Sequence, residues 1–266
     1  MIHTCQKGAL EYLTSDRIET PHCFSTRYGG VSEGPLASLN LGMHRGDSPE
    51  NVLENYRILG EAVGFRPEEV VFTKQIHEAT VEHVGKAQRG RGLLFPVEEG
   101  CDGLVTDEPD VTLTVFSADC TPILFYDPVA RAVGAALAGW RGTALGIAAA
   151  TVRKMQEEFG CRPENIRAAI GPCICENCFE TDGDVPEAMR NALGPEAESC
   201  IRPSGSKYYV NLKALNAIWL RRAGVKVVDI ARECTACEPQ RFWSHRRVGN
   251  QRGSLAALIK LKGETR

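Results

Sequence analysis

The stretch from Val111 to Met155 constrains the fold of this chain more than any other. Two apolar runs rich in β-branched and small residues predict two strands, and an apolar stripe at helical spacing follows them. Cys120 follows Asp119 within the first run, where a strand would hold its thiol rigidly. Trp140 and Arg141 mark the end of the second strand. We expect the fold and any reactive site to be organised around this corner.

Length and charge favour one domain that does not bind nucleic acid. With 266 residues and 43% hydrophobic content, the chain can bury a core of its own. No internal repeat, low-complexity tract or linker divides it. We therefore predict a single domain of mixed α and β structure over residues 1–266. A net charge of −3 offers no basic field to a phosphate backbone.

The chain carries no signal for a membrane or for export. No stretch approaches the roughly 18 apolar residues that cross a bilayer, and the first residues lack the regions of a signal peptide. We predict a cytoplasmic monomer or small homo-oligomer with no membrane partner. The eleven cysteines are odd in number and widely spread, which favours reduced thiols or metal ligation over disulfides.

Local signals predict further elements around the central corner. Capping residues predict a helix from Ser48 to Gly64. Alternation over residues 70–84 predicts one or two strands, with Gln75 and His77 on one face. Thr143 is expected to cap the helix that follows the corner. Other predicted elements are strands at 166–170, 225–230 and 257–261 and helices at 185–193 and 212–222.

Two cysteine pairs could form a metal site. Cys175 and Cys178 form one CxxC motif, and Cys234 and Cys237 form another. Two such motifs can enclose a structural zinc ion with four thiolates. The gap between the pairs is longer than in a usual zinc ribbon, so ordinary reduced cysteines are the alternative.

Cys120 and His77 offer a second site with two interpretations. A thiolate and an imidazole are both zinc ligands, and a catalytic zinc takes three protein ligands and leaves one position open. The same two residues could form a nucleophile and its base, with His77 taking the proton of Cys120. Spacing alone does not pair them.

Seven motifs in order resemble a known family. They read FSTRYGGVSEGPLASLNLG, KQIH, CDGLVTD, SADCTPILFYDP, AGWRGT, AAIGPCI and FWSHRR. In this order and at these intervals, from about Cys23 to the C-terminus, they resemble the laccase-domain family, also called the multicopper polyphenol oxidase or purine nucleoside phosphorylase family. The resemblance implies an α+β single domain, layered α/β/β/α with mixed β-sheets, and a zinc ion bound by two histidines and one cysteine.

The implied zinc site is incomplete in this chain. His77 of KQIH and Cys120 of ADC match two ligand positions. Family members typically read HAGWRGT, and here Leu137 takes the position of the second histidine. We therefore expect one zinc ion with His77 and Cys120 as its only protein ligands. Copper is less favoured, because multicopper sites require many histidines and this chain has six.

The resemblance implies phosphorolysis of purine nucleosides, namely inosine, adenosine and methylthioadenosine, together with adenosine deamination. Zinc can activate an oxygen nucleophile, and arginines hold phosphate through forked bonds. Purine nucleosides and phosphate are thus the predicted partners. The predicted catalytic residues are His77, Cys120 and Arg141. The predicted substrate and phosphate contacts are Arg27, Asn40, Gln75 and Arg246.

Two other hypotheses use the same residues. A metal-independent hydrolase would use Cys120 as nucleophile and His77 as base. A non-catalytic protein would bind purines on the same scaffold. Because leucine cannot ligate a metal, Leu137 is expected to impair a zinc-dependent phosphorylase by at least about 10–100-fold in affinity or activity.

Overall fold

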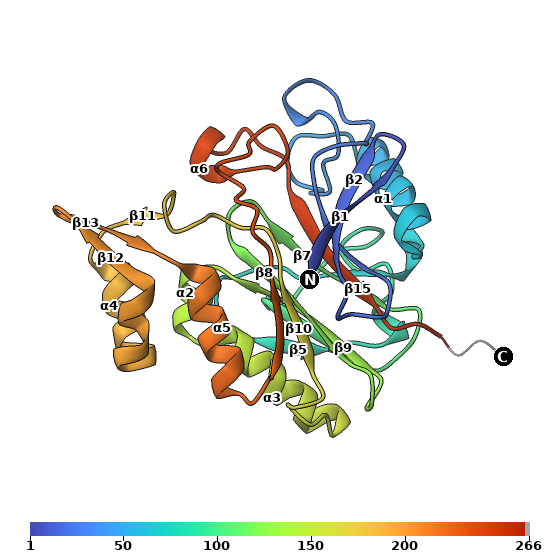
Figure 1. Cartoon of the computed structure of the whole chain (residues 1–266). Helices are drawn as coiled ribbons and strands as arrows, with labels where there is room; N and C mark the ends of the chain where they lie inside the picture. The colour runs from blue at the N-terminus through green and yellow to red at the C-terminus, as the bar shows by residue number, and fades with distance from the viewer. Residues whose placement is uncertain (264–266) are drawn as a thin grey trace.

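Two β-sheets pack face to face between helices in the computed structural model, which describes residues 1–263 (Figure 1). The first sheet has the strand order β1 (Ile2–Lys7), β2 (Leu10–Ser15), β3 (His22–Ser25), β15 (Leu255–Lys260), β7 (Thr112–Ser117) and β4 (Val70–Phe72). The second has the order β14 (Val227–Ile230), β10 (Arg167–Ile170), β8 (Thr121–Asp127), β9 (Ala132–Ala138), β6 (Gly103–Thr106) and β5 (Val81–His83). Both mix parallel and antiparallel pairs, which confirms the predicted mixed sheets.

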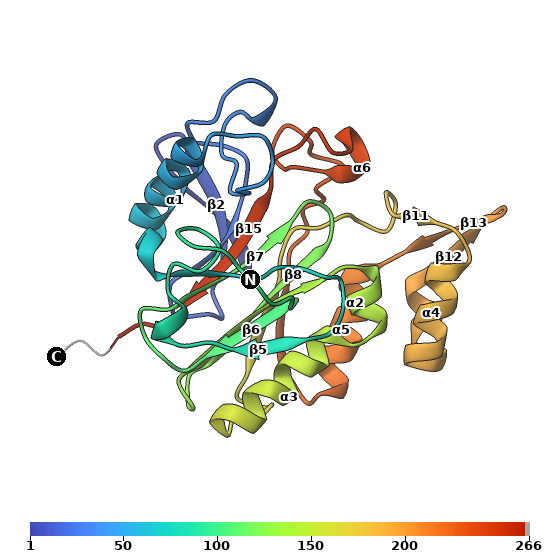
Figure 2. The same ribbon diagram turned by 180° about the vertical axis from the view of Figure 1, so that it is seen from behind.

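Helices cover both outer faces, so the predicted α/β/β/α layering is also confirmed (Figure 2). Helix α1 (Pro49–Val63) packs on the first sheet, and α3 (Ile147–Phe159) and α5 (Leu212–Arg222) pack on the second. A third sheet projects to one side with α4, and two short helices complete the structure. These elements are β11 (Glu180–Thr181), β13 (Lys207–Val210), β12 (Ile201–Ser204), α4 (Asp184–Leu193), α2 (Trp140–Ala144) and α6 (His245–Val248). Within residues 1–263, no helix is long and apolar enough to cross a membrane.

Strand β15 illustrates why the sheets stack. Leu255, Ala257 and Ile259 point into the core between the sheets, whereas Ala256 and Leu258 point toward the α1 side. Because successive side chains of a strand alternate between its faces, an uninterrupted apolar run is needed where both faces are covered. Strand β9 follows the same rule and directs Leu137 into the core between the sheets, where it is 2% exposed.

Most predicted elements occur where local signals placed them. In α1 the Ser48 hydroxyl accepts a hydrogen bond from the backbone N–H of Asn51 at 3.1 Å, and the helix ends at Gly64 with φ of 102°. The strands predicted near 166–170, 225–230 and 257–261 and the helices at 185–193 and 212–222 correspond to β10, β14, β15, α4 and α5.

Three local predictions were wrong. Gln75 and His77 lie in a loop between β4 and β5 and do not share a strand face, because His77 adopts a left-handed φ of 61°. Cys120 lies in the bend between β7 and β8, not within a strand. Thr143 lies inside α2 and does not cap α3, which begins after Gly146.

Candidate functional site

A buried carboxylate organises the loop that carries His77. Asp102 is fully buried and accepts hydrogen bonds from the backbone N–H groups of Ile76, His77 and Glu78 at 3.3, 3.0 and 2.8 Å. These bonds replace the ladder bonds that a strand would provide, and they hold His77 in its left-handed conformation. Asp102 also accepts the N–H of Leu137 through its backbone carbonyl at 2.8 Å. One aspartate therefore ties the His77 loop to strand β9.

His77 and Cys120 meet at Gly139. A methyl group built on Gly139 would lie 3.2 Å from His77 Nδ1 and 3.3 Å from Cys120 Sγ. The imidazole and the thiol thus lie against the same backbone position, at the junction of β9 and α2. The structure brings together the two residues that spacing alone did not pair. His77 is exposed, so this corner opens to solvent.

The bend before β8 is held by Asp119, which has a left-handed φ of 100°. Its carboxylate accepts a hydrogen bond from the Thr235 hydroxyl at 2.6 Å and another from the backbone N–H of Arg246 at 2.7 Å. Thr235 lies in the segment between β14 and α6, and Arg246 lies in α6 itself. Burial of the Cys120 sulfur and the neighbouring Asp119 carboxylate raise the pKa of the thiol to about 12.

Two arginines lie near this corner. Burial and the charge of Arg45 lower the pKa of Arg252 to about 10, against the opposing influence of Asp119 and Cys120. The Nε atom of Arg252 is buried and has no hydrogen-bond partner within residues 1–263. Arg45 is exposed and donates through Nε to the Ser254 hydroxyl at 3.2 Å. Two neighbouring positive charges and an orphaned donor are suited to binding an anion.

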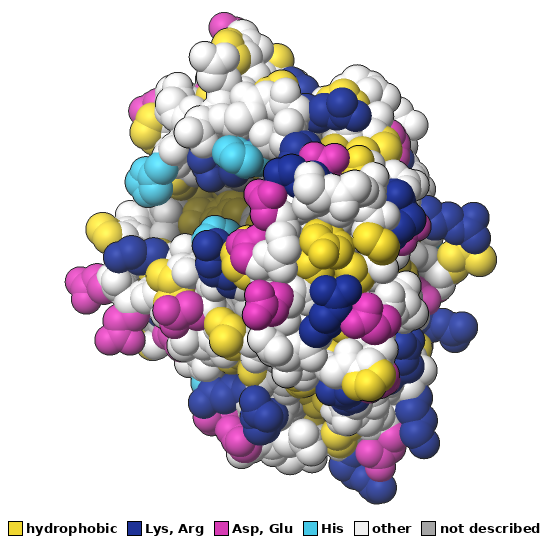
Figure 3. Space-filling view, turned by 90° about the vertical axis from the view of Figure 1, so that its left-hand side faces the viewer, with side chains coloured by type: hydrophobic (Ala, Val, Ile, Leu, Met, Phe, Trp, Pro, Cys, Tyr) yellow, Lys and Arg dark blue, Asp and Glu magenta, His cyan; other side chains and the backbone are white. Residues whose placement is uncertain are grey.

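A cavity of about 740 Å³ lies beside Arg45. Arg45 and Ser254 line it, together with Lys74 and Gln75, which shortly precede His77. Its apolar lining includes Phe72, Leu93, Phe95 and Phe116. This volume lies in the usual range of small-molecule sites, and its mixture of aromatic walls and a few polar groups is typical of them. A hollow with a hydrophobic floor and nearby histidine and basic side chains is visible on one face in Figure 3.

Comparison with known proteins identifies the family. The sequence model of the family described as multi-copper polyphenol oxidoreductase laccase matches residues 21–262. The chain belongs to this family. The resemblance carried by the seven motifs is thereby confirmed.

Relatives of this laccase-domain family share the whole fold. The chain is 40% identical to a protein of Geobacillus stearothermophilus named purine nucleoside phosphorylase YlmD, over 90% of this chain and 89% of that protein. The crystal structure of YlmD from the same species has a TM-score of 0.91 at 37% identity, covering 98% and 99% of the two chains. A Bacillus licheniformis protein titled hypothetical protein YfiH also has a TM-score of 0.91, at 34% identity over 97% and 98%.

The residues at the corner do not complete the zinc site implied for the laccase-domain family. His77 and Cys120 supply an imidazole and a thiol, but Leu137 presents a hydrocarbon side chain to the core between the sheets. Within residues 1–263, three or more potential metal ligands cluster at a different place, where the cluster consists of four cysteines. A catalytic zinc usually has three protein ligands. Because only two are present, we derive no catalytic step through zinc.

Two predicted contact residues hold the loop that contains the first family motif. The Arg27 guanidinium donates to the carbonyls of Ala37 and Pro239 and stacks 3.7 Å from the ring centre of Trp243. Asn40 is fully buried and donates to the Asp47 carboxylate at 2.9 Å. The polar groups of both side chains are thus engaged in contacts within the protein.

The other three predicted residues lie around the cavity and the corner. Gln75 lines the cavity and exchanges two hydrogen bonds with the backbone of Phe116, at 2.6 and 2.9 Å. Arg141 is exposed in α2, two residues after Gly139, and its guanidinium lies 4.2 Å from the Trp140 ring centre. Arg246 is exposed in α6 and donates to two backbone carbonyls, at 3.1 and 3.0 Å.

Sequence reasoning overlooked three residues of this site. Asp102 was not singled out, although an acid between Cys101 and Gly103 at the start of a buried strand could have indicated a buried carboxylate. Arg45 and Arg252 were not singled out, because each lies in an irregular segment with no local pattern. Only the fold brings these two segments together.

Proposed function

We propose that this chain is a purine nucleoside phosphorylase. The observation that carries the proposal is the composition of the cavity, which combines an aromatic lining with Arg45, whose charge acts on Arg252 near Cys120. The name of the Geobacillus relative supports it. In this proposal the aromatic side chains hold the purine, and the arginines hold phosphate.

The reaction requires two substrates in contact. A phosphate oxygen forms a bond to C1′ of the ribose while the bond from C1′ to the purine nitrogen breaks, and its electron pair leaves with the purine, which takes up a proton. Forked hydrogen bonds from arginine fix the phosphate and reduce its repulsion of the departing electron pair. We assign His77, Cys120 and Arg141 to the reacting end of the site. Arg27, Asn40, Gln75 and Arg246 remain predicted contacts.

The finer details remain predictions. They include inosine, adenosine and methylthioadenosine as individual substrates, adenosine deamination, dependence on zinc and a cytoplasmic location. We also propose that residues 1–266 act as one functional domain, of which residues 264–266 lie outside the described part. With Leu137 in place of a ligand, we expect the chain itself to be a slow phosphorylase.

Restoring the third ligand tests the proposal. Inosine cleavage should require phosphate in the unaltered chain, and Leu137→His should raise the rate by at least about 10–100-fold when zinc is supplied. Leu137→Asn is the matched control, because it introduces a polar group of similar size that is a poor zinc ligand. It should give no such gain.

Other outcomes would reject the proposal in favour of its alternatives. Cleavage that proceeds equally without phosphate, and that stops when Cys120 is alkylated, would indicate the Cys120/His77 hydrolase. Purine binding without turnover in the unaltered chain and in Leu137→His would indicate a non-catalytic binding protein.

A further inference from the structure

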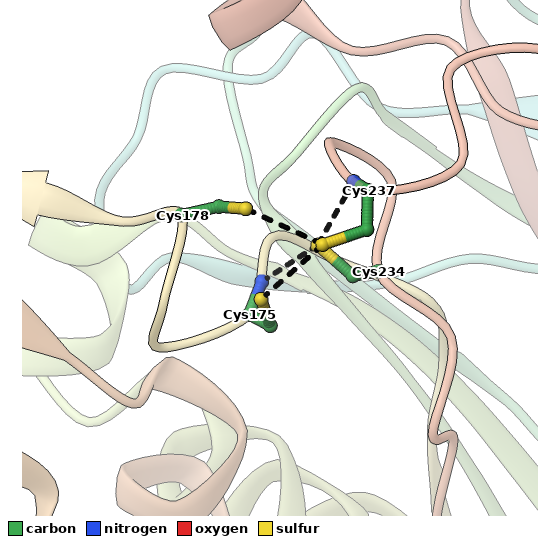
Figure 4. A group of neighbouring side chains, drawn as sticks. All are labelled: Cys175, Cys178, Cys234 and Cys237. Carbon is green, nitrogen blue, oxygen red and sulfur yellow. Dashed lines mark hydrogen bonds between the residues drawn. The ribbon is translucent and has the colours of Figure 1, made fainter.

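We propose that Cys175, Cys178, Cys234 and Cys237 bind one structural zinc ion, at a site separate from the His77 and Cys120 corner. The two pairs come from different segments, one between β10 and β11 and the other between β14 and α6. Figure 4 shows the four side chains converging from these two loops. The cluster was one of two interpretations of the cysteine pairs, and the fold now favours it.

The sulfur positions fit a tetrahedral ion. All four sulfurs lie within 4.8 Å of one another, and Cys237 Sγ lies 3.8 Å from that of Cys175 and 3.4 Å from that of Cys178. A zinc ion about 2.3 Å from each of four sulfurs spaces them about 3.8 Å apart. A disulfide would require about 2.05 Å between two sulfurs. The present spacing therefore matches shared ligation.

Each CxxC motif forms a turn that points its sulfurs inward. The carbonyl of Cys175 accepts the backbone N–H groups of Cys178 and Phe179 at 3.0 and 2.9 Å. In the second motif the Cys234 sulfur accepts the N–H of Cys237 at 3.4 Å, and across the cluster it accepts that of Cys175 at 3.1 Å. Backbone donors aimed at a sulfur favour its thiolate form, which is the form that ligates a metal.

Two cations flank the cluster. Arg246 donates to the carbonyls of Cys178 and Glu180 at 3.1 and 3.0 Å, and Arg247 donates to the carbonyl of Ala236. Four thiolates around one Zn²⁺ ion carry a net charge of −2, and the four protons pass to solvent when the metal binds. The guanidinium groups therefore lie where they offset the charge of the occupied site and brace both of its loops.

The cluster also supports the bend that precedes Cys120. Thr235 lies between the two ligands of the second motif, and its hydroxyl holds the Asp119 carboxylate at 2.6 Å. The second motif is further anchored by the N–H of Thr235, which donates to the carbonyl of Cys173 at 3.2 Å. Ligation would thus fix the position of Thr235, which donates one of the two hydrogen bonds that Asp119 receives.

Metal analysis of the full chain tests this assignment. Purified under reducing conditions without chelator, the unaltered protein should contain about one zinc per chain. Cys178→Ser and Cys237→Ser should each lose that equivalent, whereas Cys5→Ser should keep it, because Cys5 lies on β1 outside the cluster. His77→Ala should also keep it, since the two sites share no residue.

A second measurement does not depend on the folding of a variant. Cobalt exchanged into the unaltered chain should give the charge-transfer absorption of a tetrahedral tetrathiolate site. Loss of zinc in His77→Ala with retention in Cys237→Ser would overturn the assignment. Bound iron in place of zinc would also overturn it, as would a metal-free protein whose four cysteines form two disulfides by mass spectrometry.

Discussion

Removal of the Asp102 side chain should loosen the His77 loop without unfolding the protein. The carboxylate accepts three backbone N–H groups, at 2.8, 3.0 and 3.3 Å. Each hydrogen bond to a charged group contributes about 1.5–3 kcal/mol. Counting the two shorter bonds at the lower value, we expect Asp102→Ala to reduce the free energy of unfolding by about 3 kcal/mol. A typical domain has about 5–15 kcal/mol.

The position of His77 should also change when Asp102→Ala removes these hydrogen bonds. Its left-handed backbone costs about 1–2 kcal/mol relative to an ordinary conformation, and Asp102 supplies the bonds that hold it. Without them the loop relaxes, and the imidazole moves away from Gly139. A shift of about 1 Å can reduce a rate about 100-fold, so phosphorolysis should fall by roughly that factor.

Urea unfolding, followed by tryptophan fluorescence, measures the change in the free energy of unfolding. Asp107→Ala is the matched control, because Asp107 is an exposed aspartate just beyond the other end of β6. It should change stability by no more than about 0.5 kcal/mol. Asp102→Asn keeps one oxygen acceptor, so its loss of stability should lie between those of Asp107→Ala and Asp102→Ala. Equal stabilities for Asp102→Ala and Asp107→Ala would refute the role assigned to the buried carboxylate.

Two further predictions concern other carboxylates and their hydrogen-bond partners. Burial alone would raise the pKa of Glu69, but hydrogen bonds from Lys260 and Arg66 outweigh it and lower the pKa. This stabilisation is therefore present above the unfolded pKa of about 4.3 and is lost as the pH falls through the folded value. Glu69→Gln should cost about 2 kcal/mol at pH 7 in chemical unfolding, and a difference that persists unchanged in acid would contradict this. Thr235→Val should cost about 1.5–3 kcal/mol by removing the bond to Asp119, and Thr235→Ser should restore it; equal stabilities of the two variants would argue against that bond.

Helices and strands whose signals lie in neighbouring residues could be predicted from the sequence. The α1 helix is bounded by the Ser48 hydroxyl and by Gly64, and both act within a few residues of the backbone that they cap. The apolar runs of β9 and β15 likewise predicted strands, and in the structure both faces of each strand are covered. The failures occurred where a distant side chain replaced the local partner. Asp102 satisfies the N–H groups around His77, so the alternating pattern of residues 70–84 does not become one continuous strand.

The central corner remains the organising feature, but residues far from it in the sequence hold it in place. Cys120 owes its position to the Asp119 bend, whose bonds come from Thr235 and from the backbone of Arg246. No spacing rule relates these segments, because their proximity depends on the order of strands in two sheets. The same is true of Arg45 and Arg252, which sequence reasoning did not single out.

By itself, the sequence determined the family, the mixed α and β layers, the two CxxC motifs and the replacement of a ligand by Leu137. These features are carried by residue identity and local order. Only the tertiary structure decided that His77 meets Cys120 at Gly139 and that four cysteines from two loops converge. The physical reason is that such contacts join segments far apart in the chain, and packing of the sheets and loops, not local preference, sets the distance between them.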